Sequence, residues 1–318
     1  MKKILKSVIA AVCLFALILT CMPSCLQSEY TVTFVFSNGD DNLVKKVPAY
    51  GILEMPETPK KENFEFSGWY SDSECKSSYK IGSLVTSDLT LFAGWVIDYE
   101  AIVNSVTGSA MSANVKIKST HYESALFGYT ATATSVGSGA IYKKGPGCYY
   151  LLTNNHVVAK AEGAAKTEYT VYDIYGNEYE GELLASSPEC DLAIMRFECV
   201  KTLTVLEISD RVPSQDELLI SLGQPGGQFN ALSLGRMINY AEVNVSDSES
   251  KKSNVDFKVF WHTAPSKKGS SGGALIDASH KLVAINFATG TATKDGTGYT
   301  FSIPAARVIE FLVESGFR

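Results

Sequence analysis

The chain has 318 residues, of which 45% are hydrophobic and 19% are charged, and its formal net charge is −6. This balance is typical of a globular protein with a full core, and the length suffices for two ordinary domains. The negative charge and the lack of a long basic stripe argue against a nucleic-acid partner.

The first 25 residues have the pattern of a leader segment. Lysines near the start precede the apolar run SVIAAVCLFALILT, which has the length of a signal-peptide core. Pro23 ends this run before the roughly 20 apolar residues that a transmembrane helix needs. The following CMPSC resembles the lipobox of bacterial lipoproteins. We therefore expect lipidation at Cys25, with Cys21 and simple secretion as alternatives, and a mature chain outside the cytoplasm.

Residues 30–97 have the pattern of a small domain built from short strands and turns. YTVTFVF alternates apolar and polar residues, and the Asn-Gly of SNGDDN is a turn signal. With PETPK, FSGWY and DLTLFAGW, this spacing resembles the Listeria–Bacteroides repeat, the internalin B-type module of bacterial surface proteins. The resemblance implies a β-grasp-like fold that acts as a spacer, a docking module or an adhesin with a surface partner. We expect Trp69 and Trp95 in its core rather than as ligand platforms.

The chain changes character between Ile97 and about Lys118, where SVTGSAMSANVKIKS is rich in small residues. We place a domain boundary near Asp98 and expect a linker there. The second part, residues 98–318, is long enough to build its own core. We therefore expect it to fold and act without the first part.

Short strands at even spacing run through residues 98–318. Examples are CYYLLTNN, DLAIMRF, ELLISLG, KLVAINFA and GYTFSIP, joined by tight turns such as KKGPG and YGNEY. Such a series favours a sandwich or a barrel over a parallel sheet. One helix closes the chain: Ser302 is its expected cap, Pro304 suits its first turn, and Gly316 ends it. Its expected apolar face consists of Val308, Ile309 and Leu312.

Four cysteines lie beyond the leader, and they form no disulfide framework in so long a chain. Cys190 and Cys199 bound the expected strand CDLAIMRFEC, whose ends at ~3.3 Å per residue lie too far apart for a bridge. The other two are Cys75 and Cys148. No spacing of cysteine and histidine suggests a metal site, so we expect neither a metal nor another cofactor.

Three residues of the second part have the chemistry of a hydrolase with a serine nucleophile. Ser271 lies in the glycine-rich SKKGSSGGAL, but a hydroxyl is a weak nucleophile and needs an adjacent base. His156, in LLTNNHVV, suits that task because the pKa of free histidine lies near neutrality. Asp191 opens the apolar strand DLAIMRF, an unusual place for a carboxylate without a partner. Each residue alone also fits a structural role, whereas together they indicate catalysis.

The stretches SGAIY, LLTNNHVV, DLAIMRF, GSSGGALID, LVAINFA and YTFSIP, in this order, resemble the chymotrypsin-like serine proteases. The nearest group is that of the bacterial trypsin-like HtrA/Deg enzymes. The resemblance covers residues 98–318 and implies a mainly β fold, a double β-barrel with a C-terminal helix. It also implies a serine endopeptidase acting on polypeptides: Ser271 would attack the scissile carbonyl, His156 would carry the proton, and Asp191 would orient His156.

The same resemblance assigns further roles. Backbone N–H groups of Gly269 and Ser271 would form an oxyanion hole. Pro265 stands where trypsins carry their specificity aspartate, so a preference for Lys or Arg is not supported. The expected apolar substrate pocket lies on the strand VAINFA, at Ile285, Asn286 and Phe287.

Two residues depart from related patterns. Ser270 stands where the family often has Asn or Asp, a difference that the pattern tolerates. His262 precedes the nucleophile motif instead of lying on the pocket strand, so we interpret it as structural rather than as the histidine of glutamyl endopeptidases. The chain ends directly after the closing helix, so we expect no peptide-binding PDZ domain of the Deg type, and assembly into a trimer stays open.

Two other functions compete with the endopeptidase. One is a surface binding or adhesion protein whose protease-like part is inactive. The other is an esterase, which shares the triad chemistry, although the strand series lacks the βα units of that fold. A serine-directed fluorophosphonate discriminates between the endopeptidase and the binding protein, because a binding module would not react at Ser271. Membrane contact is expected only through the lipid anchor.

Overall fold

The structure, a computed structural model, describes residues 29–243, 255–291 and 298–318. The leader, with the expected lipidation site Cys25, lies outside these residues. The chain divides into two compact units, Met1–Tyr99 and Glu100–Arg318. No helix in the described ranges is long and apolar enough to cross a membrane.

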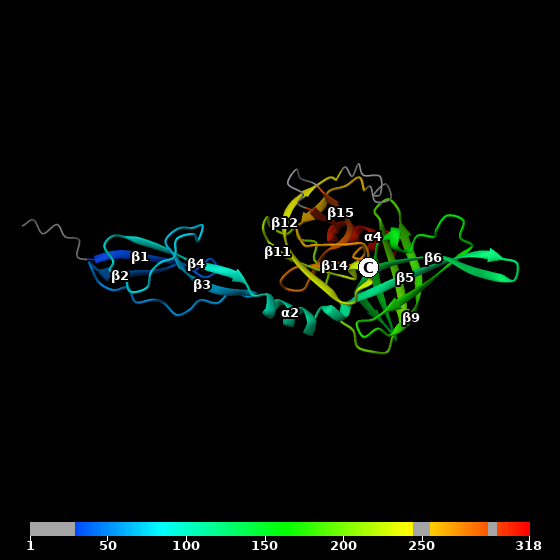
Figure 1. The fold of residues 1–318 in the computed structure, drawn as a ribbon, viewed down its shortest axis with the longest axis horizontal. Helices are drawn as coiled ribbons and strands as arrows, with labels where there is room; N and C mark the ends of the chain where they lie inside the picture. The colour runs from blue at the N-terminus through cyan, green and yellow to red at the C-terminus, as the bar shows by residue number, and fades with distance from the viewer. Residues whose placement is uncertain (1–28, 244–254, 292–297) are drawn as a thin grey trace, which may run out of the picture. The chain divides into compact units, whose positions relative to one another are not determined.

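A four-stranded sheet forms the first unit, with the strand order β2-β1-β4-β3 (Figure 1). The strands are β1 (Glu29–Val35), β2 (Leu43–Pro48), β3 (Phe64–Tyr70) and β4 (Leu89–Ile97). The central pair, β1 and β4, is parallel, and the two outer pairs are antiparallel. The alternation in β1 buries Val32 and Phe34 on one face, which starts the core of this unit.

Both tryptophans of the first unit belong to its core. Trp69 is 5% exposed, and its ring makes edge contacts with the rings of Phe34, Phe36 and Phe66. Trp95 packs against the same cluster and donates its indole N–H to the Phe36 carbonyl oxygen at 2.9 Å. The expectation that these side chains fill the core is confirmed.

Helix α2 (Tyr99–Gly108) lies at the start of the second unit, where the sequence predicted a linker. Ile102 and Val106, about one turn apart, are buried. Just beyond the helix, the Ser109 hydroxyl lies 2.8 Å from the ring Nδ1 of His280. The part of the small-residue stretch up to Gly108 therefore lies in a helix that packs on the second unit, and the rest follows that helix and includes the short 3-10 helix η1 (Met111–Ala113).

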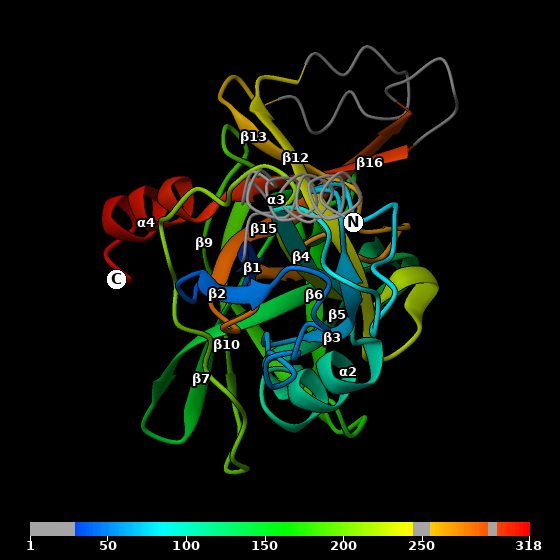
Figure 2. The same ribbon diagram turned by 90° about the vertical axis from the view of Figure 1, so that its left-hand side faces the viewer.

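Two closed six-stranded barrels form the rest of the second unit (Figures 1 and 2). The strands of the first barrel follow one another in space in the order β10-β7-β6-β5-β8-β9. Their bounds are β5 (Asn114–Ala125), β6 (Gly128–Gly145), β7 (Cys148–Thr153), β8 (Lys166–Tyr172), β9 (Glu178–Ser187) and β10 (Leu192–Glu198). The second consists, in the order β11-β12-β13-β16-β15-β14, of β11 (Leu218–Gly223), β12 (Ala231–Ala241), β13 (Val259–His262), β14 (Ala274–Ile276), β15 (Leu282–Thr291) and β16 (Gly298–Pro304). The mainly β double barrel expected from the resemblance is confirmed.

The barrels meet where β11 contacts β5 and β6. All six residues of β11, LLISLG, are buried, which explains why this strand has no polar alternation. Gly223 ends the strand, and a Cβ added there would lie 3.2 Å from the Cα of Ser270. The end of β11 therefore lies against the residue that precedes the predicted nucleophile.

Helix α4 (Ala305–Glu314), at the red end of the chain in Figure 2, follows β16. Its buried residues are Ala305, Val308, Phe311 and Leu312. Pro304, not Ser302, is its N-cap residue. The prediction for Ser302 is wrong because the strand continues through that position, where its buried hydroxyl bonds to His262 and Asn286.

The four cysteines among the described residues are free thiols. Cys190 and Cys199 lie on either side of β10, so the extended strand keeps them apart. Burial raises the pKa of the Cys190 thiol, which keeps it protonated and unreactive near neutral pH.

Candidate active site

His156 lies just beyond the end of β7, in the short helix α3 (Asn155–Val158). The apolar strand ends in Thr153, whose hydroxyl donates a hydrogen bond to the Ser138 carbonyl oxygen at 2.7 Å. This bond fixes the end of β7 to the neighbouring strand β6. The histidine is therefore presented from a well-fixed position at the end of the first barrel.

Asp191 holds His156 through two hydrogen bonds. Its Oδ1 accepts the His156 backbone N–H at 2.9 Å, and its Oδ2 lies 2.7 Å from the ring Nδ1. The Asn154 amide also donates to the Asp191 carbonyl oxygen at 2.9 Å. A carboxylate only accepts hydrogen bonds, so Nδ1 carries the proton and Nε2 is left as an acceptor. This is the tautomer that a general base requires.

The two side chains differ in exposure. The Asp191 side chain is 2% exposed, whereas that of His156 is 24% exposed. The imidazole of His156 is therefore partly accessible to solvent, whereas the carboxylate of Asp191 is not. In a catalytic pair of this kind, the buried carboxylate orients the imidazole, and the partly exposed imidazole transfers the proton.

Ser271 lies in the turn that precedes β14, against the first barrel. Its carbonyl oxygen accepts the Ser138 N–H at 2.8 Å. The next residue, Gly272, has a φ of +83°, and a Cβ there would overlap the Ser138 carbonyl oxygen and the Thr153 hydroxyl. Only glycine allows so close an approach. The structure thus brings the Ser271 turn against the end of the strand that leads to His156.

The Ser271 hydroxyl points toward β15. It donates to the Phe287 carbonyl oxygen at 3.4 Å, and among the described residues no hydrogen bond joins it to the His156 ring. In unliganded sites catalytic hydrogen bonds are often long or misaligned and tighten when substrate binds. A rotation about the Cα–Cβ bond of Ser271 changes the hydrogen-bond partner of the hydroxyl.

Gly269 has a backbone conformation with a φ of +100°, and a Cβ there would lie 2.5 Å from the Gln224 carbonyl oxygen. The preceding carbonyl, of Lys268, accepts the Gly226 N–H at 2.7 Å. Because the C=O and N–H of a trans peptide point in opposite directions, this bond turns the Gly269 N–H away from Gly226. Within the described chain, neither this N–H nor that of Ser271 donates to a protein acceptor.

Ser138 is a site residue that sequence reasoning missed. It is fully buried in β6, and its hydroxyl donates to the Gly269 carbonyl oxygen at 2.7 Å and accepts the Gln224 N–H at 2.9 Å. The available signal was its place between Gly137 and Gly139 in an apolar strand, since glycine inside a strand indicates a close backbone approach.

The predicted pocket residues lie on β15. Ile285, Asn286 and Phe287 are at most 2% exposed. The Asn286 amide group is bonded to two serine hydroxyls inside the second barrel. Phe287 bonds to the Ser271 hydroxyl through its carbonyl oxygen.

His262 lies at the end of β13 and is fully buried. Its Nε2 lies 2.8 Å from the Ser302 hydroxyl, which in turn donates to Asn286 Oδ1 at 2.8 Å. Burial lowers the pKa of His262 to about 3. The ring is therefore neutral near physiological pH, which supports a structural role.

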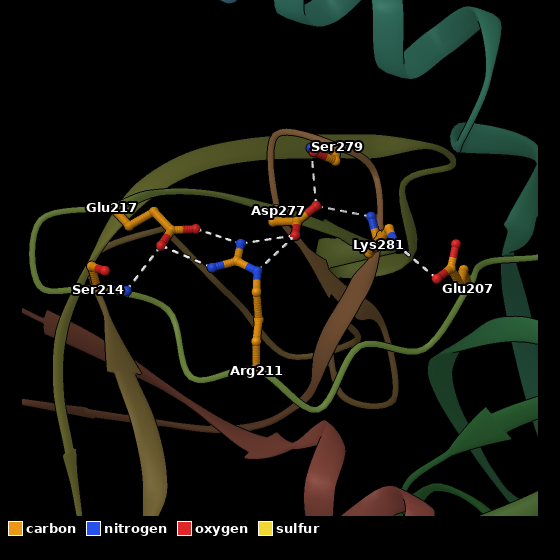
Figure 3. A network of polar contacts seen from close by, with 7 residues as sticks. All are labelled: Glu207, Arg211, Ser214, Glu217, Asp277, Ser279 and Lys281. Atoms are coloured by element: carbon orange, nitrogen blue, oxygen red, sulfur yellow. Dashed lines mark hydrogen bonds and ion pairs between the residues drawn. The ribbon is translucent and has the colours of Figure 1, made fainter. Parts of the chain in front are cut away.

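An ion-pair network supports the turn between β14 and β15 (Figure 3). The Arg211 guanidinium donates to Asp277 Oδ2 from Nε at 3.1 Å and from Nη2 at 2.8 Å, and it also bonds to Glu217. Two backbone N–H groups of the turn donate to Asp277 Oδ1. The hydrogen bonds to Glu217 raise the pKa of Arg211 further. The network thereby fixes the turn of the hairpin whose first strand, β14, follows Ser271 and whose second strand, β15, carries Phe287.

Comparison with known families agrees with this geometry. Residues 137–285 match the family described as a trypsin-like peptidase domain, and residues 30–94 match the Listeria–Bacteroides repeat domain. The second unit contains a trypsin-like peptidase domain. The first unit contains a Listeria–Bacteroides repeat domain.

Curated relatives of the peptidase domain are serine proteases. The serine protease Do-like HtrA of Bacillus subtilis is 30% identical over 190 residues, which cover 57% of this chain and 41% of that protein. A probable periplasmic serine protease of Haemophilus influenzae, described as do/HhoA-like, is 27% identical over 185 residues, which cover 57% and 37%. The chain thus spans about two fifths of the length of these relatives.

Solved structures share the fold of the peptidase domain. The HtrA-type protease AlgW with a decapeptide has a TM-score of 0.52 at 25% identity, over 67% of each chain. The Rv3671c protease from M. tuberculosis has a TM-score of 0.54 at 23% identity, over 69% of this chain and 87% of that one.

Proposed function

We propose that this chain is an extracytoplasmic serine endopeptidase that hydrolyses peptide bonds through an acyl-enzyme. One arrangement carries the proposal: Asp191 holds His156 at Nδ1, and the Ser271 turn packs on the strand that leads to His156. The serine protease names of the relatives support the same reaction.

In the proposed reaction, Ser271 Oγ attacks the carbonyl carbon while His156 Nε2 takes the hydroxyl proton. The Ser271 hydroxyl first turns from Phe287 toward His156. The N–H groups of Gly269 and Ser271 then donate to the oxyanion, and a donor of this kind typically contributes ~10²–10³ in turnover. His156 passes the proton to the leaving amine, and Asp191 stabilises the imidazolium. A water molecule repeats the cycle on the acyl-enzyme and releases the acid.

The substrate side chain next to the cut bond would lie along β15. All three side chains are buried, and the Phe287 carbonyl oxygen is the group that bonds to Ser271, so we propose that the backbone of Phe287 borders the pocket. Pro265 provides no charge to select a basic side chain. We therefore propose a preference for apolar over basic residues at this position.

Active-site labelling tests the proposal. The mature protein should react with a serine-directed fluorophosphonate and cut a proteome-derived peptide library, while Ser271→Ala should do neither and remain folded. The mechanism is supported if the wild-type protein is labelled and the Ser271→Ala variant is not. A wild-type protein that neither labels nor cuts would favour the surface binding protein with an inactive protease-like domain.

We further propose that a lipid at Cys25 anchors the mature protein to the cell envelope. The motif CMPSC supports this site, and the periplasmic name of the Haemophilus relative supports the compartment. The repeat unit would then space the peptidase from the membrane or hold a surface partner. The full-length protein should take up labelled palmitate, and Cys25→Ser should abolish uptake and release the protein to the soluble fraction. Label retained by that variant would contradict Cys25 and favour Cys21.

A further inference from the structure

The peptide segment around Ser271 receives support from the opposite barrel. Ser138 belongs to β6 of the first barrel, whereas Gly269 and Gln224 belong to the second. The Ser138 hydroxyl bonds to both of them, as donor to the Gly269 carbonyl oxygen and as acceptor of the Gln224 N–H. One buried hydroxyl therefore joins the loop before Ser271 to the end of the neighbouring strand β11.

The backbone of Ser138 extends the same connection. Its N–H donates to the Ser271 carbonyl oxygen at 2.8 Å, and its carbonyl oxygen accepts the Thr153 hydroxyl at 2.7 Å. Ser138 thus contacts the residues on both sides of Ser270 and the strand that leads to His156.

Packing alone does not fix the loop before Ser271. A cavity of about 300 Å³ borders Pro265, Lys267 and Ser270 on the side of β11 and β12. Gly269 has no side chain to pack, and glycine has more conformational freedom than any other residue. Hydrogen bonds orient both peptide units of Gly269. The Gly226 N–H holds the Lys268 carbonyl oxygen, and the unit between Gly269 and Ser270 is held at its carbonyl by the Ser138 hydroxyl and at its N–H by the Lys267 carbonyl oxygen at 2.9 Å.

We propose that Ser138 is a positioning residue that holds Gly269 in the orientation that stabilises the oxyanion. It fixes the Gly269 carbonyl, while the Gly226 N–H fixes the carbonyl of Lys268. With both peptide units held, the Gly269 N–H faces the reacting carbonyl. This inference rests on the proposed endopeptidase function, because it gives Ser138 a role in that reaction.

Kinetics of Ser138→Ala in the full chain test this role. We expect kcat on a peptide substrate to fall about 10- to 100-fold while KM changes less than about twofold, because the oxyanion contact forms only in the transition state. Affinity for a peptide aldehyde, whose adduct carries an oxyanion, should fall by the same factor. Affinity for the product peptide should not change. Ser138→Thr keeps the hydroxyl and should restore much of kcat.

Ser112→Ala is a matched control. The Ser112 hydroxyl likewise accepts one backbone N–H, at 2.9 Å, and donates to one oxygen, at 2.8 Å, but both partners belong to Thr204, away from the site. This variant removes a hydroxyl of the same kind and should leave kcat and aldehyde affinity unchanged. If Ser138→Ala does not fold, Ser138→Cys serves in its place, because a thiol fills the space but is a weak donor and acceptor.

The outcomes separate this inference from the function on which it rests. A folded Ser138→Ala or Ser138→Cys with wild-type kcat, or with equal losses of aldehyde and product affinity, would overturn the positioning role alone. A wild-type protein that shows neither cleavage nor fluorophosphonate labelling would overturn the endopeptidase proposal, and the positioning role with it. A selective loss of kcat and aldehyde affinity supports both.

Discussion

Asp191 adopts a φ of 50°, a left-handed conformation that residues other than glycine seldom occupy. In this position its carboxylate accepts hydrogen bonds from the backbone N–H and from the ring Nδ1 of His156. Unusual backbone conformations persist where surrounding contacts determine them, often at functional sites. Here the contacts are the Asn154 amide and the two His156 groups.

We expect Asp191→Asn to lower kcat ~10⁴-fold with the fold intact, because an amide favours the wrong tautomer of His156. His156→Ala should lose about as much activity as Ser271→Ala, on the order of 10⁶-fold. Peptide hydrolysis measures the activity, and circular dichroism measures the fold. Activity of Asp191→Asn within tenfold of wild type would contradict the assigned role.

His262 predicts a pH dependence of stability. Its pKa is about 3 in the folded protein because of burial, against about 6.5 in the unfolded chain. Below about pH 6.5 the unfolded state binds a proton that the folded state does not. The free energy of unfolding should therefore fall as the pH drops from 6.5 toward 3, by up to ~1.4 kcal/mol per pH unit for this group.

Urea unfolding at several pH values isolates the contribution of His262. His262→Gln keeps an amide donor near Ser302 and does not titrate, so its stability should depend less on pH than that of the wild type. The difference in the free energy of unfolding between the wild type and His262→Gln should narrow as the pH drops from 6.5 toward 3. Parallel curves for the two proteins would show that burial does not lower the pKa of His262.

At the scale of elements, the stability of the hairpin formed by β14 and β15 depends on the carboxylate of Asp277 at its turn. The Asp277 side chain is 5% exposed, and Arg211, 40% exposed, is its cationic partner. Arg211→Met should lower the free energy of unfolding by about 1–3 kcal/mol, because Asp277 would stay buried without its cation. The urea midpoint measures this change.

Arg196→Met is the matched control for this hairpin. The Arg196 side chain is 39% exposed, almost as much as Arg211, but its partner Glu182 is 58% exposed. Loss of such an exposed pair typically costs about 0–1 kcal/mol. Similar losses in the two variants would mean that the burial of Asp277 does not matter.

The elements also show which parts of the structure the sequence could predict. Strand-like segments and turn signals predicted a sandwich or a barrel, whereas the double barrel was implied by the resemblance to chymotrypsin-like proteases. Helix α2 was missed because most of its small polar residues face outward and only Ile102 and Val106 are buried. Ser302 was assigned to a cap because the local pattern does not show that its partners, His262 and Asn286, lie on other strands.

In the candidate site, too, the sequence predicts residues that lie in local motifs but not contacts between distant segments. His156, Asp191 and Ser271 each lie in a recognisable local motif, so the sequence alone is enough to propose them. Ser138 acts through Gly269, which is 131 residues away in the chain, and no local spacing reports such a contact. The orientation of the Ser271 hydroxyl toward Phe287 depends on how the Ser271 turn lies against β15, and no local pattern shows this contact.

At the scale of the molecule, we expect residues 98–318 to fold and cleave without the repeat unit. All proposed catalytic residues lie in the second compact unit, Glu100–Arg318. The kcat/KM for a short peptide should stay within about tenfold of the mature protein, which corresponds to ~1.4 kcal/mol. A larger drop would mean that the repeat unit contributes to the active site.

A shorter fragment, residues 110–318, tests the role of helix α2. It lacks Ile102 and Val106, whose burial contributes about 1.5–3 kcal/mol each. This fragment should unfold at a lower urea concentration than residues 98–318. Equal midpoints for the two fragments would mean that α2 is only a connector.

The position of Ser138 in one barrel and Gly269 in the other has a consequence during biosynthesis. A chain that crosses a membrane emerges unfolded, and the strand that carries Ser138 is complete long before Gly269 follows it. Until the second barrel closes on the first, Ser271, the proposed nucleophile, has neither its proposed base nor its ordered peptide donors. Newly exported molecules would therefore become able to cut only after folding is complete, which would spare the export machinery and unfolded sister chains from premature digestion.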